Sequence, residues 1–200
     1  MSIVCSLFRA PDSTLTVLQK QPEYFQDFEM LQDKPMKFAV KPSLIGRLFG
    51  RKPREVQLGH DEVPFARITE ADLHYLNKAW HVLHYLMTGT AEEVAAPLGF
   101  LLTGGSTIGE QLPGYDAVPR AFFSGETKKI AAEVQRLQLE TMAARFDWPE
   151  MMRQQVYPEI RIAEKFPAQL WSDYSGHFGH LKEFLQTAAA ANQGFVIRYG

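Results

Sequence analysis

The chain has 200 residues, of which 46% are hydrophobic and 22% charged, and its formal net charge is −2. This composition is ordinary for a globular protein and argues against disorder over most of the length. Because acidic and basic residues nearly balance, no overall field would attract a polyanion, and we do not expect nucleic acid as a partner.

The sequence also bears on compartment and domain number. No apolar run approaches the ~18 residues needed to cross a membrane, so we predict no membrane span. The single cysteine, Cys5, cannot form an intramolecular disulfide, which fits a reducing compartment. We therefore expect a cytoplasmic protein with one domain over residues 1–200, a length that builds one substantial core.

The N-terminal part of the chain predicts strands and helices in turn. Residues 2–8 (SIVCSLF) carry apolar side chains on both alternating faces, which is typical of a central strand. Asp12 or Ser13 can cap a following helix, and Pro22 can begin the next one. Residues 38–40 are predicted to be a short extended piece.

Residues 41–67 lose the periodic pattern and are punctuated by proline and glycine. We predict a surface loop over this range, whose few apolar residues dock on the domain. The alternative is a basic amphipathic segment, containing Arg47, Arg51, Lys52 and Arg54, that contacts an anionic partner or a membrane surface.

The stretch from Thr69 to Gly105 organises the rest of the chain. Thr69 and Asp72 form a capping-box pattern, so a helix is predicted to begin near Glu70. An apolar stripe at three- and four-residue steps gives this helix a buried face and takes it to Gly89, a residue typical of a helix C-terminus. The stripe consists of Leu73, Leu76, Trp80, Leu83 and Met87.

Two further elements are predicted within this stretch. Thr90 and Glu93 form a second capping box, which predicts a short helix directly after Gly89. Residues 98–102 are apolar and lie between Pro97 and a double glycine, as expected for a strand covered on both faces.

The C-terminal half alternates strands and helices. Residues 121–123 and 195–199 are predicted to be strands. Ser124 caps a predicted helix, Asp147 caps a short second one, and Pro167 opens a long third one.

Residues 79–89 (AWHVLHYLMTG) resemble the signature helix of the YfbM-like family, domain of unknown function 1877, which has a W-x-x-L-H-x-L-L-T-G pattern. The later family motifs follow in order: Gly104-Gly105 with Ile108-Gly109, Gly114-Tyr115 with Pro119-Arg120, residues 144–147, Tyr157-Pro158, and residues 178–194. This resemblance covers nearly the whole chain and implies a fold, since the family has no assigned reaction. Together with the alternation of strands and helices, it predicts an α/β protein in which a mixed sheet of about four or five short strands has helices packed on both faces.

The resemblance also brings together candidate ligand-binding residues. Trp80 and His84 are four residues apart and would present an indole and an imidazole on one side of the signature helix. Arg120, Arg145 and Tyr157 come from other family motifs and could join them around a cleft for a small anionic ligand. The alternative gives every one of them a structural role, with the tryptophan in the core, the histidine bonded to a carbonyl and each arginine paired with a nearby acid.

Two His-x-x-His pairs, His81 with His84 and His177 with His180, lie on predicted helices. Three-residue spacing puts both imidazoles of a pair on one face, where they could supply two metal ligands. Neither pair has the Glu-x-x-His or His-Glu-x-x-His context of known metal sites, so we predict no metal and no cofactor.

Nucleophile and nucleotide motifs are weak in this sequence. Cys5 lies in a predicted buried strand and is expected to be an inert thiol. Ser106 follows a double glycine but lacks the G-x-S-x-G pattern of hydrolases, and the glycines around it lack the G-x-G-x-x-G spacing of dinucleotide sites.

Two functions remain open at this point. The first is a noncatalytic module that binds a protein partner or a small anionic ligand, and the family context suggests an accessory or toxin-neutralising partner as one such role. The alternative is a hydrolytic enzyme with His84 as general base and Arg120 as anion stabiliser.

Overall fold

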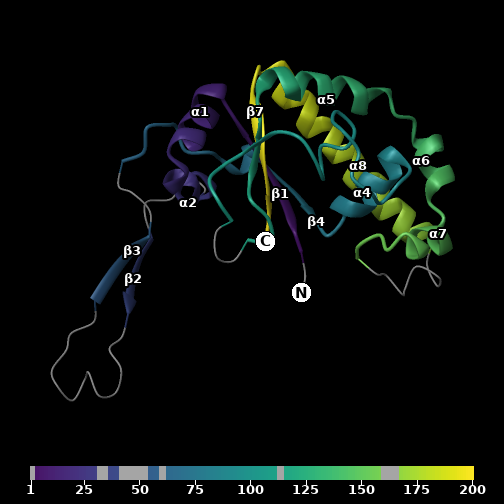
Figure 1. Ribbon diagram of the computed structural model, residues 1–200, viewed down its shortest axis with the longest axis horizontal. Coiled ribbons are helices and arrows are strands. Elements are labelled where there is room, and N and C mark those ends of the chain that lie inside the picture. Colours follow the sequence, from purple (N-terminus) through teal and green to yellow (C-terminus); the bar gives the residue numbers. More distant parts are fainter. Residues whose placement is uncertain (1–2, 31–35, 41–53, 59–61, 112–114, 159–166) are drawn as a thin grey trace, which may run out of the picture.

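The computed structural model describes residues 3–30, 36–40, 54–58, 62–111, 115–158 and 167–200 (Figure 1). The strands are β1 (Cys5–Ala10), β2 (Met36–Val40), β3 (Arg54–Leu58), β4 (Leu73–Asn77), β5 (Ser106–Thr107), β6 (Arg120–Phe122) and β7 (Gly194–Tyr199). The α-helices are α1 (Asp12–Lys20), α2 (Phe25–Glu29), α4 (Trp80–Thr88), α5 (Ser124–Arg136), α6 (Leu139–Arg145), α7 (Trp148–Arg153) and α8 (Pro167–Ala190). Two 3₁₀ turns, η1 (Pro22–Tyr24) and η2 (Glu70–Asp72), precede α2 and β4.

The main sheet has five strands in the order β4-β1-β7-β6-β5, and every neighbouring pair in it is antiparallel. Its central ladder joins β1 to β7, from Cys5 opposite Tyr199 to Ala10 opposite Gly194. The α/β class and the number of strands are confirmed, but the sheet is antiparallel where we expected a mixed one. Strand direction depends on which distant segments pair, and alternating local patterns do not contain that information.

Helices cover both faces of this sheet, as predicted (Figure 1). On one face, α1 and α2 pack on Phe8 and Val196. On the other face, α4, α5 and α8 pack on Leu7, Phe195 and Ile197. Successive residues of β7 thus enter opposite cores, which is the two-residue alternation expected of a central strand.

The predicted long helix after Thr69 is wrong in its first half. The capping box between Thr69 and Asp72 is present, but it opens only the 3₁₀ turn η2. Residues 73–77 then form the edge strand β4, which pairs with β1, and the helix begins at Trp80. Pairing with β1 outweighs the local helical spacing of the apolar residues. Gly89 ends the helix with a φ of 83°, as predicted.

The two elements predicted after Gly89 are also wrong. Residues 90–97 form bends and turns where a short helix was expected, and residues 98–102 form turns where a strand was expected. The carbonyl oxygens of Phe100 and Leu101 accept hydrogen bonds from the Arg120 side chain and therefore need no neighbouring strand.

Part of the predicted loop over residues 41–67 is regular structure. Arg54–Leu58 forms β3, which pairs with β2 in an antiparallel ladder from Met36 opposite Leu58 to Val40 opposite Arg54. The loop prediction is therefore wrong for β3. Residues 41–53 and 59–61, which include most of the predicted basic segment, lie outside the described residues.

Within the described ranges, no helix combines the length and the apolar character that a membrane crossing requires.

Candidate functional site

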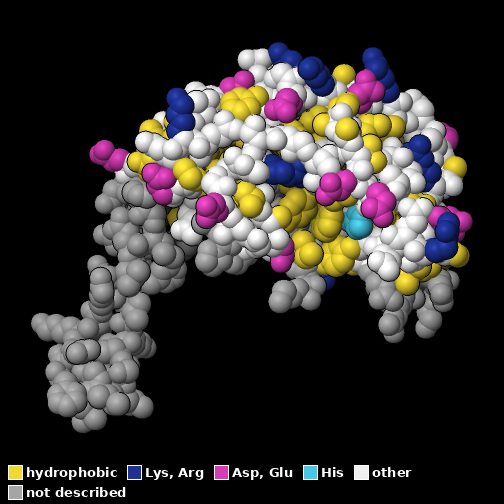
Figure 2. All heavy atoms as spheres, viewed as in Figure 1, with side chains coloured by type: hydrophobic (Ala, Val, Ile, Leu, Met, Phe, Trp, Pro, Cys, Tyr) yellow, Lys and Arg dark blue, Asp and Glu magenta, His cyan; other side chains and the backbone are white. Residues whose placement is uncertain are grey.

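A pocket of about 250 Å³ contains two of the five predicted site residues, Trp80 and Arg120. We name it the Trp80 pocket, and its lining consists of Ile3, Trp80, Leu101, Leu102, Asp116, Ala117, Arg120 and Tyr199. Figure 2 shows hydrophobic side chains gathered in the lower middle of the viewed face, near the chain ends marked in Figure 1, with charged side chains at their margin. The structure therefore places the indole of Trp80 and the guanidinium of Arg120 in the lining of one pocket.

Trp80 is held rigidly at the start of α4. Its side chain is 8% exposed, and its indole Nε1 donates a hydrogen bond of 3.3 Å to the carbonyl of Ile3. Its ring stacks on Tyr157 with centroids 5.6 Å apart and meets the ring of Tyr199 edge-on at 5.1 Å. The indole is thus a rigid wall of the pocket, because one hydrogen bond and two aromatic contacts fix its orientation.

Tyr157 stacks on the indole of Trp80 but is not part of the pocket lining. Its hydroxyl accepts a 2.8 Å hydrogen bond from the backbone N–H of Ile3, the residue whose carbonyl binds Trp80. The two aromatic side chains therefore fasten the segment before β1 to the rest of the fold.

Arg120 holds residues 98–104 in place beside the pocket, and we name these residues the turn segment. Its Nη1 donates to the carbonyl of Gly104 at 2.8 Å, and its Nη2 donates to the carbonyls of Phe100 and Leu101 at 3.1 and 2.9 Å. The hydroxyl of Tyr199 also donates to the Leu101 carbonyl. A guanidinium has five N–H groups, so donors remain after these three hydrogen bonds. Arg120 therefore positions the turn segment, and only those N–H groups that the carbonyls do not take can bind a ligand.

Buried hydroxyl and thiol groups next to the pocket do not ionise near neutral pH. Burial raises the pKa of Tyr199 well above its ordinary value of 10, and burial raises the pKa of the Cys5 thiol to about 12. Cys5 is completely buried in β1. It is therefore a neutral, inaccessible thiol, as the sequence indicated.

His84 lies outside the Trp80 pocket. Its side chain is fully buried, and its Nε2 lies 2.8 Å from the carbonyl oxygen of Glu92, so this nitrogen carries the proton. His81 makes the matching contact from its Nε2 to the Ala91 carbonyl at 3.0 Å, and its Nδ1 accepts from the backbone N–H of Tyr157. Both histidines therefore hold the turn after α4 against the helix.

Arg145, the fifth candidate, stabilises the C-terminus of α4. Its Nη1 donates to the carbonyls of Leu86 and Met87 at 2.8 and 2.7 Å. These are carbonyls of the last helical turn, which have no partner within the helix. The structure thus places Arg145 as a helix cap and not in the Trp80 pocket lining.

The sequence of this chain matches a known protein family over nearly its whole length. The family model described as "Domain of unknown function (DUF1877)" matches residues 1–198. The chain belongs to the DUF1877 family.

Solved structures add the fold of this DUF1877 protein. The chain is similar to the crystal structure of YfbM from Escherichia coli, a protein of unknown function, at 12% identity and a TM-score of 0.62. The match covers 98% of this chain and 99% of YfbM, and at this identity it shows the fold alone. The resemblance to YfbM-like proteins is thereby confirmed. No curated protein matches the chain.

The pocket of this DUF1877 protein also contains residues that the sequence did not reveal. Asp116 and Tyr199 both line it. Tyr199 shares the alternating core face of β7 with Phe195 and Ile197, so its position at the strand end was a usable signal. Asp116 stands between two family motifs and only four residues before Arg120. This closeness in sequence to a predicted site residue was a signal that it could line the same pocket.

The second histidine pair lies near another histidine on the sheet. His177 and His180 of α8 are neighbours of His74 of β4 and help to lower its pKa. In the part of the chain that the structure describes, no group of three or more His, Cys, Asp or Glu residues is placed to hold a metal ion.

A larger cavity of about 500 Å³ lies beside α5 and contains none of the predicted site residues. Phe122 and Ile130 contribute apolar walls, and Glu126, Lys129 and Glu133 carry charges of both signs around it. Because these charges sit along one helix, they do not converge on a single point as the donors of a ligand site do.

Acid is expected to destabilise the protein through His84. Burial lowers the pKa of His84 below its ordinary value of 6.5. The unfolded chain takes up a proton there near pH 6.5 while the folded protein does not, so stability is complete above that pH and declines below it. The slope from this one group is at most about 1.4 kcal/mol per pH unit.

Urea unfolding of the wild type and of His84→Gln across this pH range measures the effect. The wild-type free energy of unfolding should fall more steeply below pH 6.5 than that of the variant. His74, whose pKa burial lowers to about 4, leaves a residual slope in both proteins. Parallel profiles would contradict the prediction.

Proposed function

We propose that this DUF1877 protein is a noncatalytic binding module, an accessory protein of the cytoplasm that takes a small anionic ligand in the Trp80 pocket. The observation that carries this proposal is a cavity lined by a fixed aromatic wall and by one arginine that backbone carbonyls hold in place. An arginine oriented by backbone carbonyls costs little entropy when it binds, because its rotamer is already fixed.

The size and charge of the pocket define the ligand further. Its volume of about 250 Å³ lies just below the ~300 Å³ at which pockets for drug-sized molecules begin, so the ligand is small. Ile3, Leu102 and Ala117 give it apolar walls. Asp116 in the lining disfavours a multiply charged anion, since like charges repel. These features favour a monocarboxylate with an apolar body.

Binding is better supported than hydrolysis. The proposed general base, His84, is fully buried and its proton-bearing nitrogen is bonded to the Glu92 carbonyl. A general base must lie within hydrogen-bonding reach of the substrate, and His84 is not in the lining of the Trp80 pocket. Cys5 offers no alternative nucleophile, because burial raises its pKa to about 12.

Calorimetric titration with benzoate and phenylacetate tests this proposal. The wild type should bind at least one of them saturably. Ala117→Leu fills the pocket without touching the arginine and should weaken binding by about tenfold or more. Arg120→Gln should do the same by removing the charged donor.

The matched control is Arg136→Gln, which removes an arginine whose side chain is 74% exposed on α5 and should leave the affinity unchanged. Circular dichroism identifies any variant that fails to fold, and Ala117→Leu remains informative if Arg120→Gln loosens the turn segment. Absence of saturable binding, or equal affinity in Ala117→Leu, would refute the proposal.

A further inference from the structure

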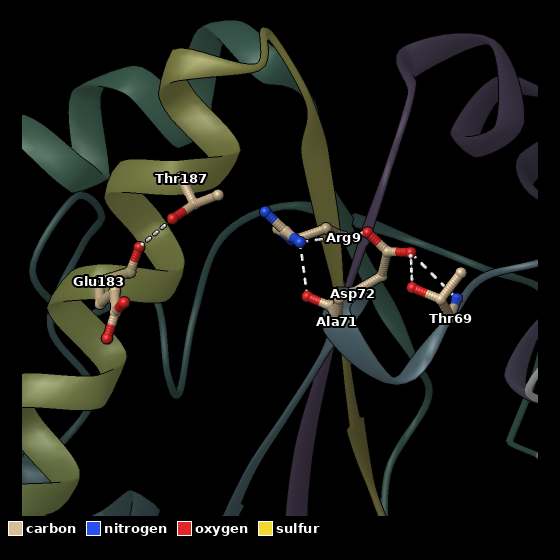
Figure 3. Close-up of polar contacts among 6 residues, drawn as sticks. All are labelled: Arg9, Thr69, Ala71, Asp72, Glu183 and Thr187. Carbon is tan, nitrogen blue, oxygen red and sulfur yellow. Dashed lines mark hydrogen bonds and ion pairs between the residues drawn. The ribbon is translucent and has the colours of Figure 1, made fainter.

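A second cleft, which the sequence did not indicate, lies between the edge of the sheet and α8. We name it the Arg9 cleft; its volume is about 300 Å³, and its lining consists of Arg9, Ala71, Leu73, His74, His180, Glu183, Phe184 and Thr187. The lining residues come from β1, η2, β4 and α8, elements far apart in the sequence. Figure 3 shows the guanidinium of Arg9 reaching from the sheet toward α8, where Glu183 and Thr187 lie one turn apart.

Arg9 is oriented by a chain of hydrogen bonds. Its Nη2 donates to the carbonyl of Ala71 and to the carboxylate of Asp72 at 3.2 Å. Asp72 is itself fixed by the backbone N–H and the hydroxyl of Thr69, at 3.0 and 2.8 Å (Figure 3). The capping box of η2 therefore acts as a support for the arginine, whose side chain is only 11% exposed.

A second donor of the Arg9 guanidinium, the buried Nε, has no hydrogen-bond partner among the described residues. Buried donors without a partner are rare in folded proteins, because each costs about 1–3 kcal/mol. The ring of Phe184 lies 6.0 Å away and does not replace a hydrogen-bond acceptor.

His74 presents a second unpaired nitrogen at the same cleft. Its Nε2 is buried without a hydrogen bond, and its ring stacks on Phe184 with centroids 5.5 Å apart. Burial, followed by the neighbouring His180 and His177, lowers the pKa of His74 to about 4. These two orphaned buried nitrogens, on different strands, thus belong to residues that line one cavity.

We propose that the Arg9 cleft is a binding site for a small oxyanion, a carboxylate or a phosphate, held by Arg9 and His74. An anion in the cleft supplies the missing acceptor for Arg9 Nε and for a protonated Nε2 on His74. His180 lies in the same lining and can donate a further N–H. Thr187 is not a donor here, because its hydroxyl already binds the Glu183 carbonyl at 2.8 Å.

The charges around the cleft set the expected strength of binding. The carboxylate of Asp72 accepts hydrogen bonds from Arg9 Nη2 and from Thr69, and it does not bind Arg9 Nε. Glu183 also lines the cleft and forms no ion pair in the described structure, so its carboxylate opposes an incoming anion. Removal of this one charge should therefore tighten binding, a response that a purely structural role for Arg9 does not predict.

The groups that face His74 determine how binding depends on pH. They are Arg9 on β1, whose guanidinium also binds Asp72, and His177, His180 and Glu183 on α8. A bound anion favours the protonated imidazole, so it should raise the pKa of His74 from about 4 and bind more tightly as the pH falls.

Calorimetric titrations with sodium phosphate and with sodium acetate, at constant ionic strength, test the site and separate the two anion chemistries. We expect saturable binding of at least one anion to the wild type. Arg9→Gln should weaken it by about tenfold or more, and Glu183→Gln should tighten it by about threefold. Arg136→Gln, which lies outside the cleft, should leave both affinities unchanged, and Arg120→Gln should leave the phosphate affinity unchanged.

His74→Phe keeps the ring stack on Phe184 and removes the unpaired nitrogen, so it reports on the site even if Arg9→Gln fails to fold. Histidine NMR of the wild type should show the pKa of His74 rising on addition of the bound anion. Absence of saturable binding by either anion would overturn the proposal. So would an affinity that neither Arg9→Gln nor His74→Phe reduces. Because the Arg120 and Arg9 variants act on separate cavities, failure here is distinguishable from failure of the Trp80 pocket.

Discussion

Replacing Phe195 with alanine is expected to lower the free energy of unfolding by about 4 kcal/mol. Phe195 is completely buried in β7, the strand that pairs with both β1 and β6. Its ring stacks on Phe122 at 4.8 Å and meets Phe100 and Phe184 edge-on at 6.0 and 6.2 Å. Truncation removes this buried apolar surface and leaves a cavity lined by three rings, Phe100, Phe122 and Phe184. These rings cannot readily close the cavity, because they belong to three separate elements: a turn, β6 and α8.

Denaturant unfolding, with equal m-values for the two proteins, measures this loss. Tyr75→Ala is the matched control, because Tyr75 is an aromatic residue of the same sheet that is 56% exposed on β4. Its effect should stay within about 0.5 kcal/mol. A loss below about 1.5 kcal/mol for Phe195→Ala would mean that the aromatic cluster is not the centre of the core.

Replacing Arg145 with alanine is expected to cost about 2–3 kcal/mol. The substitution removes the hydrogen bonds to the carbonyls of Leu86 and Met87 and leaves these acceptors without their charged partner. It also removes a positive charge from the C-terminus of α4, where the helix dipole favours one. Because α4 supplies Trp80, loosening of its last turn should also increase exchange of the α4 amide protons.

Arg145→Lys separates charge from geometry, since lysine keeps the charge but lacks the fork that reaches two carbonyls. We expect an intermediate loss for this variant. Arg136→Ala serves as the control, because the side chain of Arg136 is 74% exposed and pairs with Glu133 on the surface of α5. Equal stability of Arg145→Ala and Arg136→Ala would show that the cap contributes little.

The region from Thr69 to Met87 shows why local patterns predicted only part of the fold. Leu76, Trp80 and Leu83 are all buried, as the stripe predicted, but Leu76 enters the core from a strand and the other two from a helix. Helical spacing and strand pairing bury the same residues here. The difference comes from β1, which lies more than sixty residues earlier in the chain and offers β4 a ladder. Asn77, with a φ of 49°, turns the chain between strand and helix, and it was a local signal for the break.

The strand predicted over residues 98–102 was wrong for a related reason. Its apolar side chains fit a buried strand, but side chains from Arg120 and Tyr199 satisfy its carbonyls. A side chain that replaces a neighbouring strand leaves no periodic pattern in the segment that it binds.

The sequence pointed to those site residues that lie in recognisable motifs, and it did not point to those that only the fold brings together. Trp80 and Arg120 lie in family motifs and meet at one pocket, whereas His84 and Arg145 lie in such motifs and bond to nearby backbone. The Arg9 cleft was missed because its walls join β1, β4 and α8 only in the folded chain. One signal was available: Arg9 is a charged residue within an otherwise largely apolar strand, CSLFRA.

The ladder between β1 and β7 has a consequence for biosynthesis. The ribosome releases β1 long before residues 194–199, which form the partner strand along its full length. In the interval, one edge of β1 has only water for its backbone N–H and C=O groups, so the five-stranded sheet closes only after residue 199 leaves the exit tunnel. A nascent chain stalled before that point would expose one unpaired edge of β1 flanked by apolar side chains. Chaperones bind such surfaces, and aggregates form from them.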